Sequence, residues 1–104
     1  FSPDVEIALY RIAQEAVSNA VRHAPGATIE VELKCPRGRP TLTVTDNGPG
    51  FDPDRVRGQG LGLRTMQERA EAVGGELTIT SKPGRTRVRA ALPAGEPDGD
   101  KRRQ

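Results

Sequence analysis

This sequence has no tryptophan, one cysteine and few aromatic residues, which make up 3% of its 104 residues. With so few aromatic side chains, a base-stacking platform for nucleic acid is not expected. The single cysteine, Cys35, excludes an internal disulfide and a cysteine-based zinc cluster, and we expect it at a strand end as a small hydrophobe. No apolar run approaches the roughly 18 residues of a membrane-spanning helix, and no signal peptide is visible. These absences predict a soluble, cytoplasmic domain without nucleic-acid or membrane contact.

The length of 104 residues allows one domain with a single modest core, which must consist of Leu, Ile, Val and Ala. The formal net charge of +2 does not by itself indicate nucleic-acid binding. Because the chain begins with Phe1 and not Met, we expect it to be part of a longer protein, for which a membrane anchor outside this domain stays open. The patterned segment covers residues 1–93, and the Gly-, Pro- and charge-rich residues 94–104 are predicted to be a disordered tail.

Periodicity predicts two helices and four strands. Ser2 is typical of a helix N-cap, and the first helix is expected to run to about Ala24, before Pro25. A second helix begins near Leu63 and ends at glycines 74 and 75. Alternating apolar residues predict strands at 28–33, with one dry face, and at 41–45, 77–80 and 87–92. Hairpins in this order favour an α+β fold: a two-layer α/β sandwich with a mixed, largely antiparallel sheet and helices on one face.

The first helix carries an unusual polar ridge. Glu15 and Asn19 lie one turn apart, and Arg22 and His23 continue the same ridge, while an apolar face runs beside it. An acid, an amide, a guanidinium and an imidazole together could bind a metal and phosphate. A solvated helix face is the alternative at this point.

Two glycine-rich segments follow strands or precede helices. Asp46 ends the second strand and is followed by Gly48 and Gly50, which places an acid where sheet-based sites collect ligands. Gly58, Gly60 and Gly62 precede the second helix, where backbone amides and the helix dipole favour a phosphate. The spacing matches neither the dinucleotide fingerprint nor the P-loop. Each segment alone is also compatible with an ordinary turn, but the three features in this order are specific.

In this order, the segments resemble the ATP-binding catalytic domain of sensor histidine kinases, within the GHKL superfamily. Residues 14–24 (QEAVSNAVRHA) are similar to the N-box, residues 46–51 (DNGPGF) to the first glycine box and residues 58–63 (GQGLGL) to the second. Residues 10–15 (YRIAQE) and 66–75 (MQERAEAVGG) look most like the nitrate-sensor-like subgroup. The resemblance covers about residues 5–93.

The resemblance implies roles along the polar ridge. Asn19 would place its side-chain oxygen on a Mg²⁺ ion that bridges the ATP phosphates. Glu15 would act as a general base, or orient the attacking group. Arg22 and His23 would lie along the phosphate tail. His23 is the only histidine in the chain, and a place in the core is its alternative.

The resemblance also implies roles for the glycine boxes. Asp46 would accept a hydrogen bond from the adenine amine, and guanine would be rejected because it offers a carbonyl there. Residues 51–59 would form the lid over the nucleotide. Arg85 stands where the family usually has a glycine, so the turn before Thr86 is expected to be rebuilt. The remaining implied binding residues are those that pack around the base, present amides to the phosphates or lie near the base pocket: Gly48, Gly50, Gly58, Gly60, Leu61, Gly62 and Thr86.

The function implied is that of a two-component kinase domain. It would bind Mg-ATP and deliver the γ-phosphoryl group to a histidine on a separate helical dimerisation domain of the same parent kinase, which in turn serves a response regulator. The chain alone would bind ATP without autophosphorylation. Two alternatives stay open: an anti-sigma-factor kinase that phosphorylates a protein serine, and a non-catalytic nucleotide-sensing or docking module.

Overall fold

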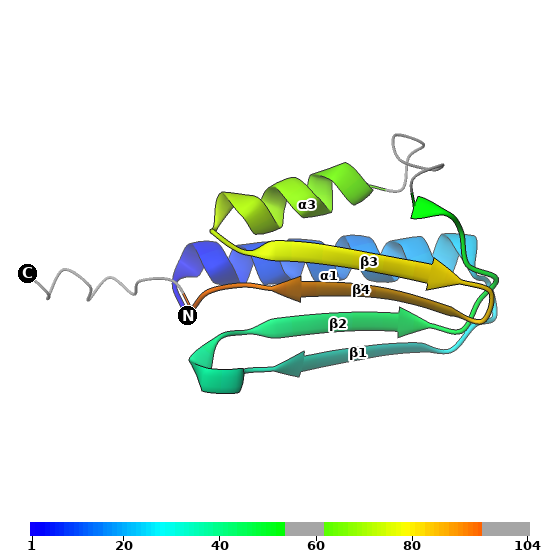
Figure 1. The fold of residues 1–104 in the computed structure, drawn as a ribbon, viewed down its shortest axis with the longest axis horizontal. Helices are drawn as coiled ribbons and strands as arrows, with labels where there is room; N and C mark the ends of the chain where they lie inside the picture. Colours follow the sequence, from blue (N-terminus) through cyan, green and yellow to red (C-terminus); the bar gives the residue numbers. More distant parts are fainter. Residues whose placement is uncertain (54–61, 95–104) are drawn as a thin grey trace, which may run out of the picture.

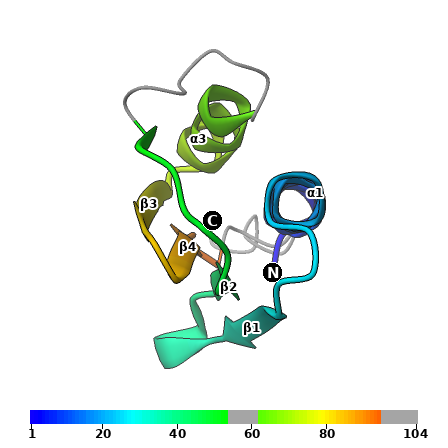
Figure 2. The same ribbon diagram turned by 90° about the vertical axis from the view of Figure 1, so that its right-hand side faces the viewer.

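The computed structural model describes residues 1–53 and 62–94 as one sheet with two long helices on one side (Figures 1 and 2). The sheet order is β1-β2-β4-β3, and the three ladders between the described strands are all antiparallel. The predicted α+β sandwich is confirmed, with an antiparallel rather than mixed sheet. The elements are α1 (Pro3–His23), β1 (Ile29–Lys34), the 3-10 turn η1 (Pro36–Gly38), β2 (Thr41–Asp46), α3 (Leu63–Ala72), β3 (Glu76–Lys82) and β4 (Arg85–Ala91).

Helix α1 begins and ends as its sequence predicts. The Ser2 hydroxyl oxygen accepts a hydrogen bond from the backbone N–H of Val5 at 3.3 Å, and Pro3 occupies the first turn. The helix ends at His23, and the Ala24 N–H caps it by donating to the Ala20 carbonyl at 2.9 Å. Its buried stripe consists of Val5, Ala8, Ile12, Ala16 and Ala20.

The core lies between this stripe, the inner face of the sheet and α3. Helix α3 contributes Leu63, Met66 and Ala70, all nearly inaccessible to solvent, and the chain turns away at Gly74 with φ +86°. The strands contribute the residues that alternate inward along β2 and β4, including Leu42, Val44, Val88 and Ala90. The predicted apolar faces of both helices are confirmed.

The register of the two central strands places the site. Asp46, the last residue of β2, pairs with Thr86 near the start of β4. The β3–β4 connection is a tight turn in which Lys82 pairs with Arg85, and Gly84 supplies the positive φ of +90°. Asp46, Thr86 and this turn therefore meet at one end of the sheet.

The prediction of a dry face along β1 is wrong for most of that strand. Val31 and Leu33 are 55% and 53% exposed, although they pair with the buried Val44 and Leu42. β1 is an edge strand of the described sheet, and α1 packs mainly over its neighbour β2, so the described helices leave the inner side of β1 largely uncovered. Cys35 follows β1 as expected but is exposed rather than packed as a hydrophobe.

The ends of the domain meet at Ser2, whose N–H donates to the Ala94 carbonyl at 3.0 Å. The predicted tail beyond this point, residues 95–104, lies outside the described residues. Within the described part of the chain, no helix combines the length and apolar character needed to cross a membrane.

Candidate functional site

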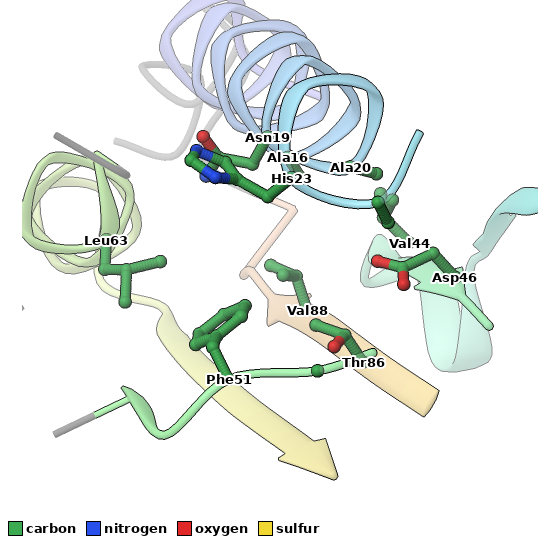
Figure 3. Close-up of a pocket in the computed structure, with 12 residues that line it drawn as sticks. Ala16, Asn19, Ala20, His23, Val44, Asp46, Phe51, Leu63, Thr86 and Val88 are labelled. Atoms are coloured by element: carbon green, nitrogen blue, oxygen red, sulfur yellow. The ribbon is translucent and has the colours of Figure 1, made fainter. Parts of the chain in front are cut away.

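A cavity of about 270 Å³ opens between α1, the ends of β2 and β4, and the start of α3 (Figure 3). Its size is near the lower end for small-molecule pockets, and it has an apolar middle with a few polar groups, as such pockets usually do. The lining residues are Ala16, Asn19, Ala20, His23, Ala24, Val44, Asp46, Gly50, Phe51, Leu63, Thr86 and Val88.

Asp46 and Thr86 form the buried polar part of the cavity. They are 8% and 6% exposed and stand on adjacent strands. The Asp46 Oδ1 atom accepts a hydrogen bond from the Gly48 N–H at 2.9 Å, which fixes the carboxylate plane. Among the described residues no hydrogen bond to the second carboxylate oxygen is found, so that oxygen can accept from a donor inside the cavity.

The loop that follows Asp46 is pressed against two other segments. A Cβ on Gly48 would lie 2.4 Å from the Ala24 Cβ at the end of α1. Gly50 has φ +80°, and a Cβ there would lie 2.5 Å from the Lys82 carbonyl oxygen. The Gly84 N–H also donates to the Gly48 carbonyl at 2.8 Å. A side chain at either glycine would therefore collide with a neighbouring segment. Without side chains, these two residues allow the loop to lie at the edge of the cavity.

At the opposite side of the cavity, α1 presents Asn19 and His23 (Figure 3). The Asn19 Oδ1 atom accepts a hydrogen bond from the Arg22 Nη2 at 2.6 Å. The same guanidinium nitrogen lies 3.7 Å from the Glu15 Oε2. Arg22 thus places a positive charge next to both the amide oxygen and the carboxylate of the ridge.

Glu15 lies against the start of α3. A Cβ on Gly62 would come within 2.6 Å of the Glu15 Oε2, and Gly62 holds φ +67° at the N-cap of α3. The positive end of the α3 dipole therefore faces the carboxylate. This contact links the ridge of α1 to the second glycine box, as the sequence predicts for a common site.

The predicted site residues separate into three groups. Five line the cavity: Asn19, His23, Asp46, Gly50 and Thr86. Four lie beside it: Glu15, Arg22, Gly48 and Gly62. Gly58, Gly60 and Leu61, with most of the predicted lid at residues 51–59, lie outside the described residues. The alternative of a core histidine is wrong, because His23 is exposed and lines the cavity.

The apolar lining was not predicted as part of a site. Ala16, Ala20 and Ala24 follow one another at four-residue spacing along α1, and their small side chains leave the space that larger ones would fill. Val88 lies between α1 and the ring of Phe51, and Val44 lies beside Ala20 and Asp46 (Figure 3). The repetition of alanine at every fourth position was the feature of the sequence that could have predicted this part of the cavity.

Three comparisons with known proteins agree. The family described as "Histidine kinase-, DNA gyrase B-, and HSP90-like ATPase" matches residues 4–96. The chain is 45% identical over 93 residues to the sensor histidine kinase MctS of Rhizobium johnstonii, covering 86% of this chain and 20% of that protein. It is 39% identical over 93 residues to the sensor histidine kinase LiaS of Bacillus subtilis, covering 88% of this chain and 26% of LiaS.

The chain therefore belongs to the histidine kinase-, DNA gyrase B- and HSP90-like ATPase family. The solved histidine kinase domain of the E. coli osmosensor EnvZ has the same fold, with a TM-score of 0.64 and 28% identity over 84% of this chain and 64% of that one. The chain spans about a quarter or less of the length of MctS and LiaS. The predicted resemblance to an ATPase domain of sensor histidine kinases is confirmed, and the nitrate-sensor-like subgroup stays a prediction.

Asp46 at the end of β2 and Asn19 on the ridge of α1 line the same cavity, although they come from different elements. In the turn before Thr86, Gly84 lies one position before Arg85 and provides the positive φ of +90°. The expected rebuilding of this turn stays a prediction. No group of three or more His, Cys, Asp or Glu side chains in residues 1–53 and 62–94 is arranged to hold a metal. A single amide ligand such as Asn19 suits a Mg²⁺ ion that is held mainly by phosphates and water.

Proposed function

We propose that this domain binds Mg-ATP in the cavity and serves as the catalytic domain of a two-component sensor histidine kinase of the nitrate-sensor-like subgroup. One observation carries the proposal: the buried Asp46 carboxylate and the Asn19 amide line the same largely apolar cavity, although they lie on different elements. An apolar slot with an acceptor at one side and a hard oxygen ligand at the other matches a purine triphosphate.

Base recognition would fall to Asp46. With one oxygen held by the Gly48 N–H, its second oxygen is placed to accept from the exocyclic amine of adenine. Guanine would bring a carbonyl oxygen to the same place, and two acceptors would then face each other in a buried setting. The side chains of Val44, Val88 and Phe51 would cover the faces of the ring.

The phosphates would lie toward α1 and the N-terminus of α3. His23 and Arg22 supply polar and positive groups there, and the backbone at Gly62 begins a helix whose dipole favours an anion. Gly58, Gly60 and Leu61 are proposed to add backbone amides. When bound, Mg²⁺ would neutralise charge on the phosphates, with Asn19 as its protein ligand.

Phosphoryl transfer would require an imidazole from outside this chain. The bond between the γ-phosphorus and its bridging oxygen would break, ADP would leave with that electron pair, and a new bond would form to the nitrogen of the acceptor histidine. Glu15 is placed beside the phosphate end, where its carboxylate would orient the acceptor imidazole or take its proton.

The acceptor histidine would belong to a helical dimerisation domain of the same parent kinase, and a response regulator would receive the phosphoryl group. We propose a cytoplasmic domain, formed by residues 1–93, that contacts neither membrane nor nucleic acid. MctS and LiaS are sensor kinases, which favours this function over a serine kinase or a sensing module.

Incubation of the purified chain with γ-labelled ATP is expected to leave no stable label on the protein. The only histidine, His23, lies in the nucleotide cavity and is proposed to contact the phosphates, not to accept one. Acid-sensitive label on the chain, lost in a His23→Ala variant, would overturn this assignment. Label that appears on an added dimerisation domain would support it.

Mg²⁺ is expected to tighten ATP binding by about tenfold or more in the wild type, and by much less in Asn19→Ala, because the amide oxygen that would bind the ion is removed. Titration calorimetry with ATP, in Mg²⁺ and in EDTA, measures the difference. Gln14→Ala is the matched control, since Gln14 is an exposed amide on the same helix outside the cavity. An unchanged Mg²⁺ effect in Asn19→Ala would argue against the ligand.

A further inference from the structure

Ser81 joins two walls of the cavity without lining it. It is the partner of Thr86 in the β3–β4 ladder, and the two hydroxyl oxygens lie 2.6 Å apart. The Ser81 oxygen also accepts a hydrogen bond from the Phe51 N–H at 2.8 Å. One hydroxyl therefore touches both the backbone of the residue whose ring covers the cavity and the buried hydroxyl that faces into it.

The direction of these hydrogen bonds restricts what Thr86 can offer. A serine hydroxyl has one hydrogen to donate and can accept two hydrogen bonds. The Phe51 N–H can only donate, so it occupies one acceptor position of Ser81. If Ser81 gives its hydrogen to Thr86, the hydrogen of Thr86 is left for the cavity. A ring nitrogen of adenine that lacks a proton can accept that hydrogen.

The surroundings fix this geometry. Thr86 is 6% exposed and held in register against Asp46 on one side and Ser81 on the other. Gly50, the residue before Phe51, lies against the Lys82 carbonyl, so the loop is held to the end of β3 at two neighbouring positions. Removal of the Ser81 hydroxyl would leave the Phe51 N–H and the Thr86 hydroxyl to find other partners in a partly buried setting.

We propose that Ser81 is a positioning residue for base recognition: it directs the hydroxyl of Thr86 into the cavity and holds Phe51 over the ring. This inference rests on the proposed ATP binding. Ser81 acts through Thr86 and Phe51 and has no contact of its own with the base.

The test is a double-mutant cycle measured by titration calorimetry with ATP and GTP. Ser81→Ala is expected to weaken ATP binding by about 5–30-fold and to narrow the preference for ATP over GTP. Ser81→Thr, which keeps the hydroxyl, should restore binding to within about threefold. Thr86→Val should weaken ATP binding, and Ser81→Ala added to it should cost clearly less than in the wild type, since one residue acts through the other.

Thr80→Ala is the matched control, because Thr80 precedes Ser81 on β3, also carries a hydroxyl and is exposed. It should bind ATP like the wild type. Thermal unfolding checks each variant, and if Ser81→Ala does not fold, Ser81→Cys with its weaker hydrogen bonds replaces it in the cycle.

Two results would overturn the role of Ser81 and leave the proposed ATP binding intact. One is an unchanged ATP affinity in a folded Ser81→Ala variant. The other is a double variant whose loss of ATP affinity equals the product of the two single fold-changes. Absence of ATP binding by the wild type would overturn the proposed function and this inference together.

Discussion

Asp46→Asn is expected to weaken ATP binding by about 1–3 kcal/mol and to remove most of the preference for ATP over GTP. The substitution keeps the size of the side chain and an oxygen for the Gly48 N–H. It replaces the second acceptor oxygen by an NH₂ group, which would face the amine of adenine as a second donor and the carbonyl of guanine as a suitable partner. Calorimetric titration of wild type and variant with both nucleotides measures this change.

Glu30→Gln is the control for the loss of one negative charge, because Glu30 is an exposed acid of β1 that does not line the cavity. Its affinities should equal those of the wild type. If the wild type bound ATP and GTP equally well, Asp46 would have no role in reading the base.

Gly50→Ala is expected to destabilise the domain by about 2–5 kcal/mol and to abolish ATP binding. Alanine at φ +80° is strained, and its Cβ would lie 2.5 Å from a backbone oxygen that cannot rotate away. The loop would have to leave the β3–β4 turn, which separates Phe51 from Ser81. Chemical denaturation and ATP titration give the two readings.

Gly26→Ala is the control that separates the cost of a positive φ at alanine from the cost of the steric clash with Lys82. Gly26 has nearly the same φ, +84°, but a Cβ there would lie more than 4 Å from every atom of the described residues outside its own neighbours. It should cost only about 1 kcal/mol and leave ATP binding unchanged. Equal losses in the two variants would mean that the contact with Lys82 is unimportant.

Much of this architecture could be predicted because the relevant signals are local. The Ser2 cap and the apolar spacing of α1 are set by neighbours within one or two turns of helix. The alternation of apolar and polar residues also predicts β2 and β4, because in both strands every second residue is buried and the residues between are more exposed. Asp46 alone was compatible with an ordinary turn, and it became a candidate only because the polar ridge, the acid with its two glycines and the second glycine segment occur in that order.

Other features depend on what lies across the fold, which a linear pattern does not contain. Val31 alternates as regularly as Val44, yet Val44 is buried and Val31 is exposed, because α1 packs mainly over β2. The space left by Ala16 and Ala20 becomes a cavity only because of the strands opposite them. The proposed role of Ser81 depends on its hydrogen bond with Phe51, which is 30 residues away in the sequence.

The uncovered side of β1 has a consequence for solubility. An unpaired strand edge with branched side chains on one surface is a template that another polypeptide can extend. Glu30, Glu32 and Lys34 occupy the alternate positions of the same strand, all exposed to water. Pairing with another strand would remove water from these charged side chains, so we expect them to oppose aggregation through this edge.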